Sequence, residues 1–144
     1  MKLAAPAAVA LTADALCVPA ATAAPTHSNS FCGTAKGVAK YLSATLKLDS
    51  SGAVAETPAN LKLAYTTVVR SEGALLQSAP GSLKPSLTGA FSFVNLVKRD
   101  FAKAGWQIKN MTPYFPALVA KGNAEAKQIT AVRAYLRGSC HLSI

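Results

Sequence analysis

Apolar side chains recur along most of the chain with the three- and four-residue spacing of one face of an α-helix. The first such segment is followed by the polar cluster Asp49–Gly52, whose composition is typical of a turn. The spacing therefore predicts a first helix that ends before this cluster. Its apolar face contains Val38, Tyr41, Leu42, Thr45 and Leu46.

The next segment opens with Thr57 and Pro58. Threonine caps helix N-termini and proline suits the first helical position, so this pair predicts the start of a second helix. Pro80–Gly81 predicts its end. Its apolar face contains Leu61, Ala64, Tyr65, Val68, Leu75 and Leu76. Glu72 falls on the same stripe, where it either pairs with a cation of a neighbouring helix or lies at the stripe edge and reaches water.

A third helix is predicted from about Ser82, with Pro85 in its first turn, where proline is tolerated. Gly105 is a natural stop for this helix. The apolar stripe is the clearest in the chain: Leu83, Leu87, Phe91, Val94, Val97 and Phe101.

The last segment follows a connector, Trp106–Met111. Thr112-Pro113 can cap a helix, but Pro116 and Gly122 interrupt the pattern. We therefore expect a short helix and then a longer one from about Asn123. The inner face is expected to contain Leu118, Ala126, Ile129, Val132 and Leu136.

No stretch alternates apolar and polar residues for long enough to indicate a β-strand. Four helices joined by short connections predict an all-α fold, an antiparallel four-helix bundle. The chain of 144 residues is long enough for one such domain.

The N-terminal segment has the three parts of a secretory signal peptide. Lys2 supplies a positive charge, Leu3–Ala13 is an apolar run, and Ala21–Ala23 is a small-residue cleavage site that places Ala24 first in the mature chain. Asp14 argues against a permanent transmembrane helix, because a charge at the membrane centre costs about 2.5–3.5 kcal/mol.

We accordingly expect a signal peptide over residues 1–23, a flexible leader over 24–31 and a helical bundle domain over 32–144. The expected location is extracellular or in the cell envelope. The alternative is that the first segment is an alanine-rich N-terminal helix of a cytosolic protein.

Removal of the signal peptide would remove Cys17 and leave Cys32 and Cys140, an even number in an exported chain. The two cysteines lie near the two ends of the predicted bundle, so one disulfide would join its N- and C-terminal ends. The competing interpretation is a zinc site that adds His27 and His141, although their spacing matches no usual pair of zinc ligands.

Basic residues outnumber acidic ones by 15 to 6, which gives a formal net charge of +9. On one continuous first helix, three lysines would lie within roughly 40° of one another. Basic residues recur late in the third and fourth helices. The candidate basic surface consists of Lys36, Lys40, Lys47, Lys98, Arg99, Lys103, Arg133 and Arg137.

Such a surface suits an anionic partner: an acidic envelope polymer, a lipid headgroup or an acidic protein. Nucleic acid is not expected, because no aromatic residues are interleaved with the charges. The alternative is a solvated face that keeps the protein in solution.

Hydrolase and nucleotide-binding motifs are absent from the sequence, which contains neither G-x-S-x-G nor S-x-x-K. The acids outside the signal peptide are scattered over the segments: Asp49, Glu56, Glu72, Asp100 and Glu125. We therefore expect no enzymatic activity, no catalytic residues, no cofactor and no bound metal.

Four aromatic residues fit the apolar stripes less well than the others and cluster around the third helix and its connector. If they gather, they would line a groove for an apolar ligand between helices. The alternative is that they cover the end of the bundle. These residues are Phe93, Trp106, Tyr114 and Phe115.

These features together resemble small secreted proteins of high-GC actinobacteria whose activity is uncharacterised. The resemblance rests on Ala21–Ala23, on Phe31-Cys32-Gly33, on the turn Ser78–Leu83 and on the closing motif Tyr135-Leu136-x-x-x-Cys140. The chain is also similar to haem-carrying secreted helical proteins of actinobacteria, which have a cysteine near each end. No residue here corresponds to a haem ligand of that group. The resemblance implies a secreted helical domain and no particular activity.

The sequence thus predicts a secreted, monomeric binding protein with a basic surface for anionic partners and no membrane span after signal cleavage. The second hypothesis is a carrier of an apolar or haem-like ligand held between the helices.

Overall fold

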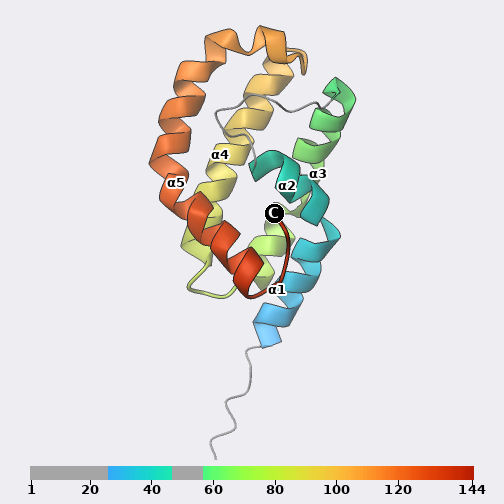
Figure 1. The fold of residues 1–144 in the computed structure, drawn as a ribbon, viewed down its shortest axis with the longest axis vertical. Coiled ribbons are helices and arrows are strands. Elements are labelled where there is room, and N and C mark those ends of the chain that lie inside the picture. Colours follow the sequence, from blue (N-terminus) through green and yellow to red (C-terminus); the bar gives the residue numbers. More distant parts are fainter. Residues whose placement is uncertain (1–25, 47–56) are drawn as a thin grey trace, which may run out of the picture.

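The computed structural model describes residues 26–46 and 57–144, and the regular structure over these ranges is entirely helical. The expected signal peptide, Lys47 and the turn Asp49–Gly52 lie outside the described residues. In chain order the elements are α1 (Thr26–Gly37), α2 (Ala39–Leu46), α3 (Pro58–Ser78), α4 (Lys84–Lys103), the short 3-10 turns η1 (Ile108–Asn110) and η2 (Thr112–Tyr114), and α5 (Phe115–Gly138) (Figure 1).

The helices pack in a series that follows the chain. Helices α1 and α2 both pack on α3, α3 packs on α4, and α4 packs on α5 (Figure 1). The three long helices, α3, α4 and α5, lie along the long axis of the molecule, and each is antiparallel to the one before it. With α1 and α2 counted as one interrupted unit, four main helical units pack together, which confirms the predicted all-α bundle.

The predicted boundaries of α3 are confirmed. Thr57 is its N-cap, with an extended backbone, and the Thr57 side chain accepts a hydrogen bond from the main-chain N–H of Asn60 at 3.3 Å. Pro58 occupies the first helical position, where a backbone N–H would have no partner within the helix, so its absence costs nothing. The helix ends at Ser78, before Pro80–Gly81.

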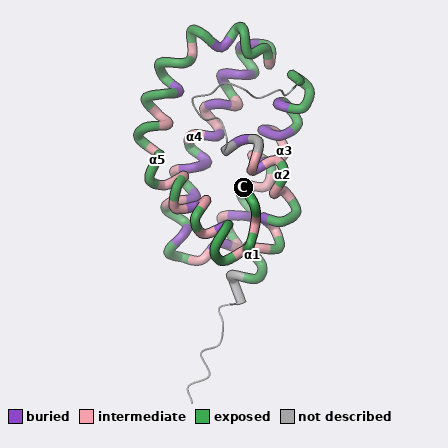
Figure 2. The backbone as a smooth tube through the Cα atoms, in the orientation of Figure 1, coloured by how far each residue is buried: buried purple, intermediate pink, exposed green. Residues whose placement is uncertain are grey.

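Helix α4 carries the stripe that was clearest in the sequence, and the residues of this stripe belong to the hydrophobic core. Figure 2 shows buried positions along this helix. The helix ends in a Schellman motif: the N–H of Trp106 bonds to the carbonyl of Phe101 at 2.8 Å, and the N–H of Gly105 bonds to that of Ala102 at 3.2 Å. Gly105 has a φ of 64°, a left-handed conformation that glycine adopts without steric penalty. All residues of the predicted stripe are buried: Leu83, Leu87, Phe91, Val94, Val97 and Phe101.

Helix α5 differs from the expectation of a short helix followed by a longer one. It runs without interruption from Phe115 to Gly138, and Thr112-Pro113 forms part of the preceding 3-10 turn instead. Pro116 lies in the first turn of α5, where proline displaces no helical hydrogen bond.

The first helical unit also differs from expectation in two ways. Val38 separates α1 from α2, so the helix predicted to be continuous is divided. Helix α1 begins at Thr26, and residues 26–31, expected to belong to a flexible leader, are therefore helical. Phe31 and Ala35 are buried, and Phe31 packs edge-to-face against Tyr135 of α5 with ring centroids 5.7 Å apart.

Helices α4 and α5 approach each other closely at Gly89. A Cβ atom at Gly89 would lie 2.6 Å from Oε2 of Glu125 and 2.8 Å from Cγ of Gln128. The absence of a side chain at this position therefore sets the distance between the two helices.

We expect Gly89→Ala to lower the free energy of unfolding by about 1–2 kcal/mol, because overpacking typically costs about 1–3 kcal/mol while alanine returns at most about 1 kcal/mol of helix propensity. Denaturant unfolding followed by circular dichroism measures the change. Gly73→Ala in α3 is the matched control, since a Cβ there meets nothing within 4 Å. The control should be neutral or stabilising, and equal behaviour of the two variants would contradict the close approach.

Candidate functional site

The described acids are all engaged by neighbouring side chains. Asp14, Asp49 and Glu56 lie outside the described residues, which leaves three carboxylates. Two of the three pair with a cation and the third bonds to a neutral amide, so basic residues far outnumber the acids within the described ranges. Glu72 accepts from Nδ2 of Asn95 at 2.9 Å, Asp100 from Nε of Arg99 at 3.3 Å, and Glu125 from Nζ of Lys121 at 2.8 Å.

Two of these acids bear on the sequence interpretation. Glu72 is half-buried, and its partner is the amide of Asn95 on α4, where an Arg or Lys was one expectation. Asp100 is buried, which the sequence analysis did not single out. The signal was present, because Asp100 lies three residues after Val97 on the buried stripe of α4. Arg99 compensates the charge of this carboxylate.

The predicted basic residues are distributed over separate parts of the molecule. Lys36 and Lys40 are exposed, but they lie on α1 and α2, so a common face of one helix no longer follows. Lys47 lies outside the described residues. Lys98, Arg99 and Lys103 lie in the last turns of α4, whereas Arg133 and Arg137 lie in the last turns of α5, at the other end of this antiparallel pair (Figure 1).

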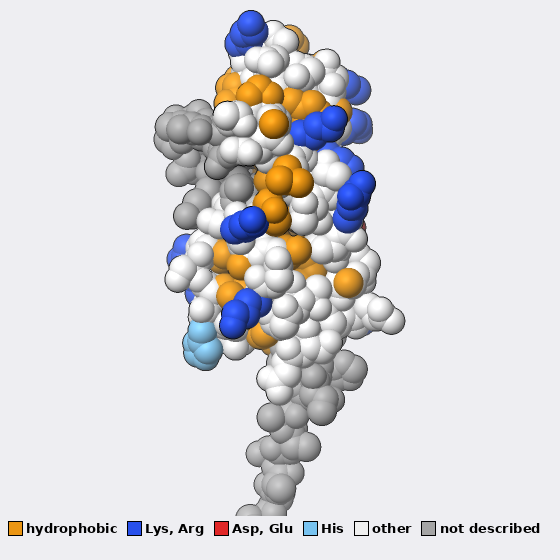
Figure 3. All heavy atoms as spheres, turned by 90° about the vertical axis from the view of Figure 1, so that its right-hand side faces the viewer, with side chains coloured by type: hydrophobic (Ala, Val, Ile, Leu, Met, Phe, Trp, Pro, Cys, Tyr) orange, Lys and Arg blue, Asp and Glu red, His pale blue; other side chains and the backbone are white. Residues whose placement is uncertain are grey.

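The surroundings of individual cations also differ. Nζ of Lys40 lies 4.6 Å from the ring centroid of Tyr41, a cation–π contact. Nε of Arg133 is buried and has no hydrogen-bond partner within the described part of the chain. On the side of the molecule where α1, α2 and α3 lie, Lys and Arg side chains are spaced along the whole length, with apolar side chains between them and hardly an acidic one in view (Figure 3).

The four aromatic residues of the candidate groove occupy different settings. Trp106 stacks on Phe101, with ring centroids 6.0 Å apart and planes within 5°, and lies 6.5 Å from the ring of Tyr65. Phe93 packs at the α4–α5 contact, 3.4 Å from the position of a Cβ at Gly122. Tyr114 is half-buried against the core, and Phe115 is 47% exposed.

Tyr65 is the largest fully buried side chain and lies at the centre of the aromatic cluster. Its hydroxyl has no hydrogen-bond partner among the described residues. Burial raises the pKa of the Tyr65 hydroxyl above its ordinary value, because the phenolate would lose its solvation. This tyrosine therefore stays neutral and acts as a core residue.

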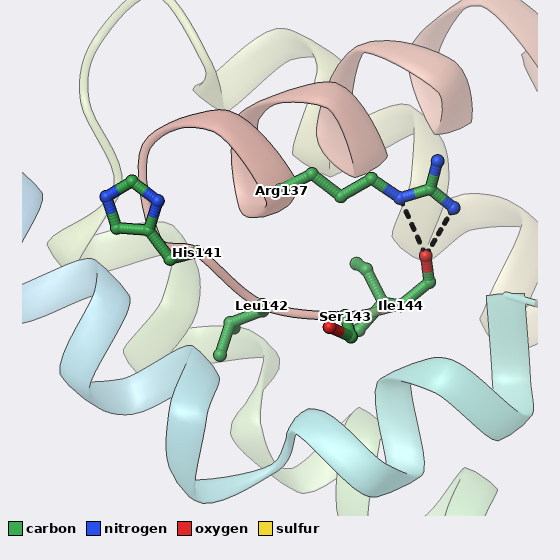
Figure 4. Close-up of a pocket in the computed structure, with 5 residues that line it drawn as sticks. All are labelled: Arg137, His141, Leu142, Ser143 and Ile144. Atoms are coloured by element: carbon green, nitrogen blue, oxygen red, sulfur yellow. Dashed lines mark hydrogen bonds between the residues drawn. The ribbon is translucent and has the colours of Figure 1, made fainter.

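A cleft of about 480 Å³ lies at the end of α5, lined by Arg137 and the four residues His141–Ile144 (Figure 4). The chain turns sharply here: His141 has a left-handed φ of 54°, and the N–H of Leu142 reaches the carbonyl of Leu136 at 3.0 Å. Ile144 is buried, and its main-chain oxygen accepts hydrogen bonds from Nε and Nη2 of Arg137.

The polar groups of this cleft point in different directions. The guanidinium of Arg137 is directed at Ile144, while the imidazole of His141 lies at the opposite end of the returning segment 141–144 (Figure 4). Arg137 thus stabilises the returning chain, and His141 stands apart from it. The guanidinium of Arg137 is the group of the lining that bonds to the returning chain, so this arrangement is suited to holding residues 142–144 in place.

The predicted disulfide is confirmed. Cys32 of α1 and Cys140, just beyond α5, are bonded, with Cα atoms 5.1 Å apart. Because both sulfur atoms are in the disulfide, neither is a thiolate that could bind zinc, and the alternative zinc site is wrong.

We expect the double variant Cys32→Ser, Cys140→Ser to lose about 2–4 kcal/mol of unfolding free energy, because its unfolded chain is no longer cross-linked. Thermal unfolding followed by circular dichroism measures this loss. Treating the wild-type protein with dithiothreitol should produce the same loss and should leave the double variant unchanged. A reduced wild type as stable as the oxidised one would show that the bond does not hold the ends together.

Among the described helices, none combines the length and apolar character needed to cross a bilayer. Comparisons with models of protein families, with curated proteins and with solved structures found no match to this chain. The molecule is identified by its architecture, as a small all-helical protein with one disulfide between its N- and C-terminal regions.

Proposed function

We propose that this is a secreted, non-enzymatic protein of the cell envelope or extracellular space whose positively charged surface binds anionic partners. The observation that carries the proposal is that the few described carboxylates are bonded within the fold, while the basic residues far outnumber them. Three carboxylates lie in the described residues, and all three are bonded to neighbouring side chains. The chain contains 15 basic residues, of which Lys2 and Lys47 alone lie outside the described ranges. Of the 13 basic residues in the described ranges, Arg99 and Lys121 pair with a described carboxylate, so most of the positive charge there is uncompensated by these acids and attracts anions from solution.

The disulfide supports the expected location. Such bonds persist in oxidising compartments and are rare in the cytosol. The tripartite N-terminal segment predicts export to such a compartment, as does the resemblance to small secreted actinobacterial proteins.

The separation of the basic groups bears on the mode of binding. Lys36 and Lys40 lie on the α1–α2 unit, while Lys103 lies at the end of α4. Charges spread in this way suit an extended anionic polymer or a charged surface better than a small anion, which requires converging donors. The second hypothesis, a carrier of an apolar or haem-like ligand, has weaker support, because Trp106 and Phe93 are packed against Phe101 and α5.

We expect the oxidised protein to be retained on heparin-agarose at low ionic strength and released as salt screens the charges. The triple variant Lys36→Gln, Lys40→Gln, Lys103→Gln should bind soluble heparin about tenfold more weakly, because each exposed ion pair contributes about 0.2–1 kcal/mol. Isothermal titration calorimetry measures the affinity.

The matched control is the triple variant with arginine at the same positions, which keeps every charge and should bind as the wild type does. Binding that does not change with salt, or an equal loss in the glutamine and arginine variants, would contradict a charge-based function.

A further inference from the structure

One end of the molecule differs in character from the rest. It contains the last turn of α4, the turns η1 and η2 and the first turns of α5, residues 101–120, which we call the tip (Figure 1). The disulfide lies toward the opposite end, where α5 terminates beside α1. The tip is therefore remote from the bond that closes the fold.

Exposed apolar side chains are concentrated at the tip. Among the described residues, four large apolar side chains are strongly exposed, and three of them belong to the tip: Ile108 at 38%, Phe115 at 47% and Val119 at 60%. The fourth is Leu63 of α3. Phe115 and Val119 are four residues apart on α5 and so share one face of the helix. Concentrated exposed apolar surface of this kind marks a site of interaction.

The tip is also positively charged. Residues 101–124 contain Lys103, Lys109 and Lys121 and no acidic residue. The acids that flank this stretch are already bonded, Asp100 to Arg99 and Glu125 to Lys121. Lys103 and Lys109 are exposed.

Protruding apolar side chains flanked by lysines fit the interface of an anionic bilayer. The apolar groups enter the boundary between headgroups and acyl chains, while the ammonium groups contact lipid phosphates. Trp106 and Tyr114 support this orientation, because both rings are half-buried at the tip and such amphipathic rings suit the membrane interface. A groove on a partner protein would instead be expected to meet an apolar stripe free of lysines.

We propose that the tip is a docking site for anionic lipid bilayers, inserting Ile108, Phe115 and Val119 while Lys103 and Lys109 contact the headgroups. This inference rests on the proposed function and narrows its anionic partner to a membrane surface. The protein would bind at the surface as a peripheral protein, with its disulfide-bonded end facing away from the lipid.

The test uses the full oxidised protein and two kinds of vesicle, phosphatidylcholine alone and phosphatidylcholine mixed with phosphatidylglycerol. We expect co-sedimentation with the mixed vesicles, weakened by salt. Trp106 is the single tryptophan of the chain, and it lies in the tip. Its fluorescence should therefore be quenched by brominated acyl chains in the mixed vesicles.

Two pairs of variants localise the contact. Phe115→Ser, Val119→Ser should reduce partitioning by about tenfold or more, because the apolar area that enters the lipid is lost. Ala74→Ser, Ala134→Ser changes exposed apolar residues of α3 and α5 that lie away from the tip, and should leave partitioning unchanged. Lys103→Gln, Lys109→Gln should reduce partitioning by about fivefold per lysine, whereas Lys84→Gln, Lys127→Gln should have a smaller effect. All these side chains are exposed, so unchanged thermal unfolding confirms that each variant folds.

Four outcomes would overturn the lipid proposal. Retention on heparin without vesicle binding would make the tip proposal wrong and leave the proposed function intact. Absence of both kinds of binding would contradict both proposals. Equal losses in the Ala74, Ala134 variant and in the Phe115, Val119 variant would show that the tip is not the contact. Dimerisation of the free protein in analytical ultracentrifugation, abolished by Phe115→Ser, would assign this face to a second copy of the chain.

Discussion

The covalent bond between Cys32 and Cys140 closes a structure that would otherwise be an open series of helices. The extensive interfaces join α1 and α2 to α3, α3 to α4, and α4 to α5. The bond connects the two ends of this series across a sequence separation of 108 residues. A loop of this length loses much conformational entropy when it is closed in the unfolded chain, and in the chain-entropy model a loop of about 100 residues contributes roughly 4.7 kcal/mol. The edge-to-face contact of Phe31 with Tyr135 and the burial of Ile144 lie beside the same junction.

The sequence predicted those features that depend on local chemistry. The cap at Thr57, the proline after it and the apolar stripe of α4 need no knowledge of neighbouring helices, and all three are present in the structure. The disulfide followed from counting cysteines. The break at Val38 and the continuity of α5 through Gly122 were not predicted, because tertiary packing decides whether a weak local signal ends a helix.

Candidate site residues were harder to predict, because a helical wheel describes one helix and carries no information about how helices are ordered in space. A helical wheel places Lys36 and Lys40 on one face of a single helix, but in the structure they lie on different helices. The basic residues of α4 and of α5 both lie near the C-terminal end of their helix. Because the two helices are antiparallel, these residues lie toward opposite ends of the pair. The cleft beside α5 depends on the left-handed backbone of His141, and a histidine signals this conformation only weakly in the sequence.

The arrangement divides the molecule into an end that is covalently fixed and an end that presents apolar and basic side chains. The tip is packed against the core at several points despite its distance from the disulfide. The Schellman motif fixes the backbone of Gly105 and Trp106, and the Trp106 ring is stacked on Phe101 and close to Tyr65 in the core. Met111, between the two 3-10 turns, is buried and anchors the connector at a second point. Side chains held in this way lose little conformational freedom on contact with a partner, so more of the interaction free energy remains for binding. Trp106, one of the four aromatic residues suggested as a ligand groove, is packed with Tyr65 and Phe101 instead and so supports the tip from the core. Phe115, another of the four, is exposed at the tip.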